Sequence, residues 1–147
     1  MIDKNSSVEA LMHKAFLSKN DKIDYVTKIF KDSYHLNSSL VNRINDLMNE
    51  YDLNEEDIGI NIESFDALYN LLSDISFKNL SIGITNDGNA TISQDNGITY
   101  FYAQIKNENE VLYNILKDGY PKTDLLATDT LSNFKKSLNE FLMIELK

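Results

Sequence analysis

The chain has 147 residues, of which 42% are hydrophobic and 25% charged, with a formal net charge of −9 and no cysteine. This composition is too apolar for a disordered protein, the length suffices for one domain with its own core, and the lack of cysteine excludes disulfides, thiolate metal sites and a cysteine nucleophile. No apolar run approaches the ~20 residues of a membrane span, and the first residues, MIDKNSSVEAL, lack the basic start and apolar centre of a signal peptide.

The first half of the chain carries apolar residues at helical spacing. Ser6 and Glu9 form a capping-box pattern, which predicts a first helix that runs to about Phe16. Two further apolar stripes, over 23–30 and 40–51, predict a second and a third helix.

A fourth helix is expected to begin with Asn54 as its N-cap. Three acids, Glu55, Glu56 and Asp57, would then occupy the first turn, where the helix dipole favours negative charge. The apolar stripe of this helix follows over 62–75. The helical part is therefore predicted to extend over 1–78.

The spacing of apolar residues then changes from about 3.6 to 2, which predicts a switch from helix to strand. One strand is expected over 80–85 and another from Ala90. A third, over 98–105, is apolar on both faces, so it should lie in the middle of the sheet, covered by helices on at least one side. The sequences NDGN and DNG between these strands suit the tight turns of an antiparallel meander, because Gly and Asn accept positive φ.

The segment EVLYNILKDG, at 110–119, fits either a fourth strand or a short helix capped by Gly119. We favour the strand, because the long apolar strand before it would otherwise lack a partner on one edge. A short extended piece near 125–128 and a terminal amphipathic helix complete the chain. The prediction is an α+β fold in a single domain over 1–147, with helices over 1–78, an antiparallel meander of three to five strands over 79–128 and a C-terminal helix over 129–147.

The sequence contains no pattern typical of a catalytic or cofactor site. Its two histidines, His13 and His35, have no metal-ligand spacing, and phosphate-binding loops and nucleophile elbows are absent. We therefore expect no enzymatic activity, no cofactor and no metal site. A metal-dependent hydrolase that uses the many carboxylates stays a lesser alternative.

A helix-turn-helix can be drawn through 24–48, with a recognition helix that opens at Ser38. Arg43 would be the only base on that helix. Because contacts to phosphates dominate affinity for DNA, a reader with one cation and a strongly acidic chain is a poor candidate. We expect no direct binding of nucleic acid and no binding to membranes.

The negative charge is concentrated in the middle of the chain. The net charge is −1 over 1–53, −8 over 54–118 and 0 over 119–147. An uneven charge of this kind steers partners of opposite sign, so a natural partner would be a basic protein. The carboxylates predicted to contact that partner are Glu55, Glu56, Asp57, Asp87, Asp95, Glu108, Glu110 and Asp118.

The stretch LSIGITNDGNATISQDNGITYFYAQIKNENEVLYNILKDG, with the amphipathic helix after it, resembles the meander-plus-helix module of small bacterial antitoxins, immunity proteins and defence or counter-defence factors. The resemblance covers about 80–145, and Ile92 stands where such modules often carry an aromatic residue. It implies no particular site residue, because the module has no fixed active site.

Charge and resemblance together predict a non-enzymatic cytoplasmic protein, in a bacterium or a phage-infected host cell. It would bind and neutralise a basic, nucleic-acid-processing partner such as a toxin, a nuclease or a defence effector. An antitoxin, an immunity protein and an anti-CRISPR-like phage inhibitor all fit this description. The alternative is a structural or adaptor domain whose helical part forms a homodimer.

Overall fold

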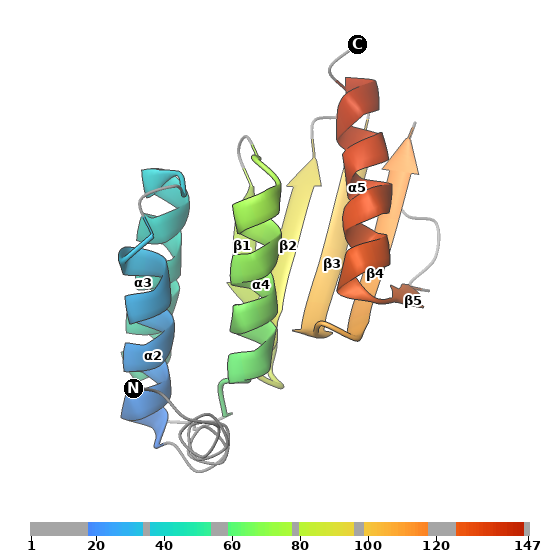
Figure 1. Cartoon of the computed structure of the whole chain (residues 1–147). Helices are drawn as coiled ribbons and strands as arrows, with labels where there is room; N and C mark the ends of the chain where they lie inside the picture. The colour runs from blue at the N-terminus through green and yellow to red at the C-terminus, as the bar shows by residue number, and fades with distance from the viewer. Residues whose placement is uncertain are drawn as a thin grey trace, which may run out of the picture.

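The computed structural model describes residues 18–33, 36–53, 59–77, 80–95, 99–117 and 126–145. The predicted α+β fold is confirmed: helices precede an antiparallel five-stranded meander, and a last helix follows it (Figure 1). The elements are α2 (Lys19–Lys31), α3 (Ser38–Leu53), α4 (Ile62–Asp74), β1 (Ser81–Ile84), β2 (Ala90–Asp95), β3 (Thr99–Asn107), β4 (Glu110–Lys117), β5 (Ala127–Asp129) and α5 (Leu131–Glu145). No helix in these ranges has the length and apolarity needed to cross a membrane.

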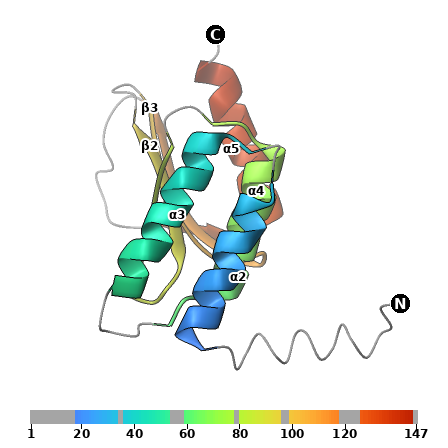
Figure 2. The same cartoon turned by 90° about the vertical axis from the view of Figure 1, so that its left-hand side faces the viewer.

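The strands pair in chain order, β1-β2-β3-β4-β5, so β3 is the central strand, as its apolar sequence predicts. Phe101, Ala103 and Ile105 on one face of β3 are fully buried. The helices α4 and α5 lie against this face, as Figures 1 and 2 show from two directions. Tyr100 and Tyr102 alternate with the buried residues and stay half-exposed on the opposite face.

The ambiguous segment EVLYNILKDG forms a strand, β4, over its first eight residues. It pairs with β3 on one side and with β5 on the other. Val111 is fully buried, and the ring of Tyr113 packs against Phe134 of α5 with 5.0 Å between centroids. Apolar residues of β4 therefore face the helices at a period of two, which a short helix could not provide.

The helix α2 contacts both α3 and α4, and α3 also contacts strand β1 of the sheet directly. Val26 and Phe30 of α2, Ile44 of α3 and Phe65 of α4 are all fully buried in the shared core. Phe30 also meets the ring of Tyr69 edge-on at 5.6 Å between centroids. The apolar stripes seen in the sequence are thus the faces that these helices bury.

The helix α4 begins at Ile62, so the prediction that it begins behind Asn54 is wrong. Gly59 has φ of 73°, outside the helical region, and Asn61 is the N-cap residue. The carboxamide of Asn61 makes no capping hydrogen bond and instead donates to Asn89 Oδ1 at 2.7 Å and to the Lys106 carbonyl at 2.9 Å. Contacts to the sheet therefore fix the start of this helix.

Two chain reversals lie at one end of the sheet, which we call the hairpin end: the β1–β2 turn over 85–89 and the β3–β4 hairpin around 107–110. Both α4 and α5 begin at this end (Figure 1). The Asn61 N–H donates to the Gly88 carbonyl at 3.0 Å, and the Leu131 N–H donates to the Glu108 carbonyl at 2.9 Å. The predicted NDGN turn is confirmed, with Gly88 at φ of 83°.

One buried hydroxyl also joins α4 to the sheet. Ser64 is fully buried; its Oγ donates to the Ile105 carbonyl and accepts the Ala90 N–H at 2.7 Å. The predicted first helix over 6–16 and the DNG turn between β2 and β3 lie outside the described residues.

Candidate acidic binding site

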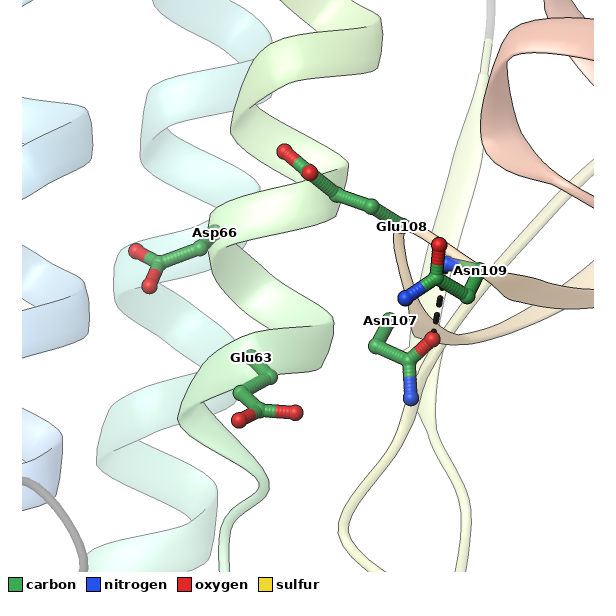
Figure 3. Close-up of a pocket in the computed structure, with 5 residues that line it drawn as sticks. All are labelled: Glu63, Asp66, Asn107, Glu108 and Asn109. Carbon is green, nitrogen blue, oxygen red and sulfur yellow. Dashed lines mark hydrogen bonds between the residues drawn. The ribbon is translucent and has the colours of Figure 1, made fainter. Parts of the chain in front are cut away.

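A surface pocket of about 300 Å³ lies between the first half of α4 and the β3–β4 hairpin. Three carboxylates and two carboxamides line it, from two segments about 40 positions apart in the sequence (Figure 3). No lysine or arginine is among the described residues that line it. The lining residues are Glu63, Asp66, Asn107, Glu108 and Asn109.

The helix α4 contributes the acids on one side of the pocket. Glu63 is exposed in the first turn, where the positive end of the helix dipole favours a carboxylate. Asp66, three positions later, accepts a hydrogen bond of 2.8 Å from the Tyr25 hydroxyl of α2. Its carboxylate points away from the hairpin in Figure 3. Glu63 is therefore the carboxylate of α4 that stands most freely at the pocket.

The β3–β4 hairpin contributes the other side. The Asn107 side chain accepts the Asn109 N–H at 2.8 Å, which closes the tight turn around Glu108. This turn holds the exposed Glu108 between the two carboxamides, and the side chain extends toward α4 (Figure 3). The Asn70 amide of α4 donates to Glu108 Oε1 at 3.4 Å, a long hydrogen bond.

Two described lysines beside the pocket pair with other acids. Lys106 pairs with Glu110 at 3.4 Å, and Lys135 pairs with Asp74 at 2.6 Å. Within the described ranges, neither Glu63 nor Glu108 forms an ion pair. Both Lys–acid pairs compensate charge beside the pocket and leave the negative charge of its lining in place.

The structure places three of the predicted partner-binding acids at the hairpin end and one elsewhere. Asp87 is exposed in the β1–β2 turn, while Glu108 and Glu110 belong to the β3–β4 hairpin. Of these, Glu108 lines the pocket. Asp95 lies at the opposite end of β2, across from Tyr100, and the structure does not bring it near the others. Glu55, Glu56, Asp57 and Asp118 lie outside the described residues.

The surroundings of Asp95 differ from those of the pocket. Burial raises the pKa of Tyr100, and the nearby Tyr102 and the Asp95 carboxylate raise it further. Asp95 therefore faces a phenol that is protonated at neutral pH and belongs to the tyrosine-bearing face of the sheet. The structure separates two surface regions that the charge map of the sequence treats as one.

The pocket does not have the geometry of a metal centre. Among the described residues, no three Asp, Glu or His side chains come close enough together to hold a metal ion. The carboxylates at the pocket stand apart from one another, an arrangement suited to a broad cationic group with several N–H donors.

Arg43, the base on the recognition helix that the sequence allowed, donates from Nε to the Ile82 carbonyl of β1 at 3.2 Å.

Four lining residues are not among those predicted from the sequence: Glu63, Asp66, Asn107 and Asn109. The two acids are three positions apart on α4 and fall off its apolar stripe, a spacing that places both on one side of the helix. The pattern Asn-Glu-Asn in a predicted hairpin indicates a closed turn with an acid at its tip. Neither pattern shows that the helix and the hairpin meet.

Comparison of the chain with models of protein families, with curated proteins and with solved structures found no match.

Proposed function

We propose that this protein is a non-enzymatic binding protein that neutralises a basic, nucleic-acid-processing partner by occupying the cationic surface of that partner. The pocket at the hairpin end receives a guanidinium or ammonium group of the partner. An antitoxin, an immunity protein and a phage counter-defence inhibitor would all act in this way.

One observation carries the proposal: the pocket is lined by carboxylates and carboxamides and contains no described cation. Such a lining supplies acceptors for several N–H donors, and a planar guanidinium with five donors matches it better than a compact ammonium does. Asn107 and Asn109 supply neutral acceptors beside the charged ones, which helps to fix orientation. A partner that presents arginine is therefore the best fit.

Two further features support a basic partner. The segment 54–118, which holds all five lining residues, carries a net charge of −8. A field of one sign raises the rate of encounter with an oppositely charged protein by about 10- to 1,000-fold. The partner would contact nucleic acid through the same cationic groups. Occupation of those groups by this protein would therefore block the binding of nucleic acid to the partner.

A short oligo-arginine peptide serves as a probe of this function. The double variant Glu63→Gln and Glu108→Gln keeps the size of both side chains and removes two charges at the pocket. Its matched control is Asp46→Asn with Glu140→Gln, two exposed acids on other helices. Both doubles change the net charge from −9 to −7.

We expect the pocket double to weaken peptide binding by about 2- to 30-fold, because each exposed ion pair contributes about 0.2–1 kcal/mol. The control double should bind within about twofold of the unmodified protein. The measurement is fluorescence anisotropy with labelled peptide. Equal losses in the two doubles would show that only bulk charge matters, and the proposed role of the pocket would then be wrong.

Salt gives an independent measurement. Between about 10 mM and about 150 mM salt the screening length falls from about 30 Å to about 8 Å. Stopped-flow association with the peptide should slow by about tenfold or more over this range. An association rate that barely changes with salt would contradict charge steering as the mechanism.

A further inference from the structure

The helix α5 contacts both sides of the pocket, the β3–β4 hairpin and the helix α4. The Leu131 N–H at its start donates to the Glu108 carbonyl at 2.9 Å, which anchors the backbone of that residue. One turn later, Lys135 reaches across to α4, where its ammonium donates to Asn70 Oδ1 at 2.5 Å and to Asp74 Oδ2 at 2.6 Å. The Lys135 side chain is only 18% exposed, whereas the Asp74 side chain is 58% exposed.

The contact to Lys135 decides which way the Asn70 amide faces. An ammonium has three donors and no acceptor, so it must meet the carbonyl oxygen of Asn70. The NH₂ group of the same amide then points to the other side, where Glu108 Oε1 lies 3.4 Å away. Without the ammonium, the two ends of the amide would be free to exchange positions, and the carbonyl would repel the carboxylate.

We propose that Lys135 is a positioning residue of the acidic pocket, which acts through Asn70 to hold the Glu108 carboxylate toward α4 for a cationic group of the partner. This inference rests on the proposed function, because it assigns a role within the same pocket. It joins α5, α4 and the hairpin in one chain of contacts, Lys135 to Asn70 to Glu108.

Loss of positioning and loss of a positive charge have opposite effects on the affinity for a cationic peptide. Replacement of Lys135 by Met removes a positive charge near the pocket and leaves Asp74 without its partner, so the field alone would make a cationic peptide bind more tightly. Loss of positioning makes it bind more weakly. Lys136→Met, at an exposed neighbouring position of α5, makes the same charge change and reports the field alone.

The test measures the Kd of the oligo-arginine peptide by fluorescence anisotropy. We expect Lys135→Met to weaken binding by about two- to fivefold, the worth of one hydrogen bond, and Lys136→Met to leave it unchanged or tighter. In the Glu108→Gln background, Lys135→Met should no longer weaken binding, because there is no carboxylate left to position. Lys135→Arg, which keeps the donors, should bind as the unmodified protein does.

Binding by Lys135→Met that is as tight as that of Lys136→Met overturns the inference, as does an equal loss with and without Glu108. Should Lys135→Met fail to fold, Asn70→Ala tests the same chain of contacts, since it keeps the Lys135–Asp74 pair and removes the amide. It too should weaken binding in the presence of Glu108 only. If Glu108→Gln binds the peptide as tightly as the unmodified protein does, the proposed function is refuted. If Glu108→Gln weakens binding but Lys135→Met and Asn70→Ala do not, only this inference is refuted.

Discussion

Replacement of Ser64 by Ala removes a buried hydroxyl that bridges α4 to two neighbouring strands. In the native protein Ser64 Oγ accepts the Ala90 N–H of β2 and donates to the Ile105 carbonyl of β3. All three residues are fully buried, so water cannot take the place of the hydroxyl. The substitution therefore leaves a buried N–H without this acceptor and a buried carbonyl without this donor.

The expected loss follows from these two hydrogen bonds. Each contributes about 1 kcal/mol net, and a buried donor left unsatisfied costs about 1–3 kcal/mol, so the free energy of unfolding should fall by about 2–4 kcal/mol. For a chain of this size, each kcal/mol corresponds to a change in Tm of about 2–4 °C. A loss near the middle of this range lowers Tm by about 6–12 °C.

The assay is urea unfolding followed by circular dichroism, with a thermal melt alongside. Ser73→Ala is the matched control on the same helix, because its exposed hydroxyl donates to the Tyr69 carbonyl at 2.8 Å within the helix and water can replace it. The control should stay within about 0.5 kcal/mol of the unmodified protein. If Ser64→Ala is as stable as Ser73→Ala, the buried bridge does not hold α4 to the sheet.

Three further substitutions test the hairpin end. A Cβ on Gly88 would clash with the Gly59 carbonyl oxygen, at a backbone φ of 83°. Gly88→Ala should therefore disrupt the turn and lower the free energy of unfolding, measured in urea, by more than about 3 kcal/mol. In Gly59→Ala the φ is also positive but the added Cβ meets nothing within 4 Å, so the free energy of unfolding should fall by only about 1 kcal/mol. Hydrogen bonds from the Asn133 side chain and the Thr130 N–H hold the pKa of Asp129 below the ordinary value for aspartate. The Asp129 carboxylate therefore contributes stability above its unfolded-state pKa, and this stability is lost as the pH falls through its folded-state pKa. The Asp129→Asn variant should lack this part of the dependence of stability on pH. An Asp129 pKa measured by NMR at or above the ordinary value for aspartate would contradict the prediction.

The sequence predicts most of the secondary structure because short-range patterns decide it. The alternation of apolar and polar residues in 80–85 predicts strand β1, and the apolar residues on both faces of 98–105 predict the central strand β3. The spacing in 110–119 fits a strand or a helix, and the need of β3 for a partner on its second edge favours the strand that β4 forms. Glycine and asparagine at 86–89 give the first turn, because one position there needs positive φ.

The start of α4 could not be predicted in the same way. Asn54 and Asn61 both precede a possible first turn, and the local pattern favours the first of them. What decides the start is distant in sequence: Asn61 is held by Gly88, Asn89 and Lys106 of the sheet. These three hydrogen bonds, which exist only once the sheet has formed, outweigh the local capping preferences.

The pocket escaped prediction for a related reason. A net charge along a segment says which stretch is acidic, but it does not say which acids lie on one surface. The meander carries Asp95 to the far end of the sheet and brings Glu108 beside Glu63, which is 45 positions earlier. Only the packing of α4 on the central strand unites them.

The most direct test of the central claim is an NMR titration of ¹⁵N-labelled protein with the oligo-arginine peptide. We expect the largest chemical-shift changes in the backbone amides of Glu63 and of 107–109 and in the side-chain amides of Asn107 and Asn109. In the double variant Glu63→Gln and Glu108→Gln, the same changes should need a higher peptide concentration. Changes centred on Asp95 and Tyr100, or spread evenly over the acidic surface, would contradict the claim that this pocket receives the cationic group of a partner.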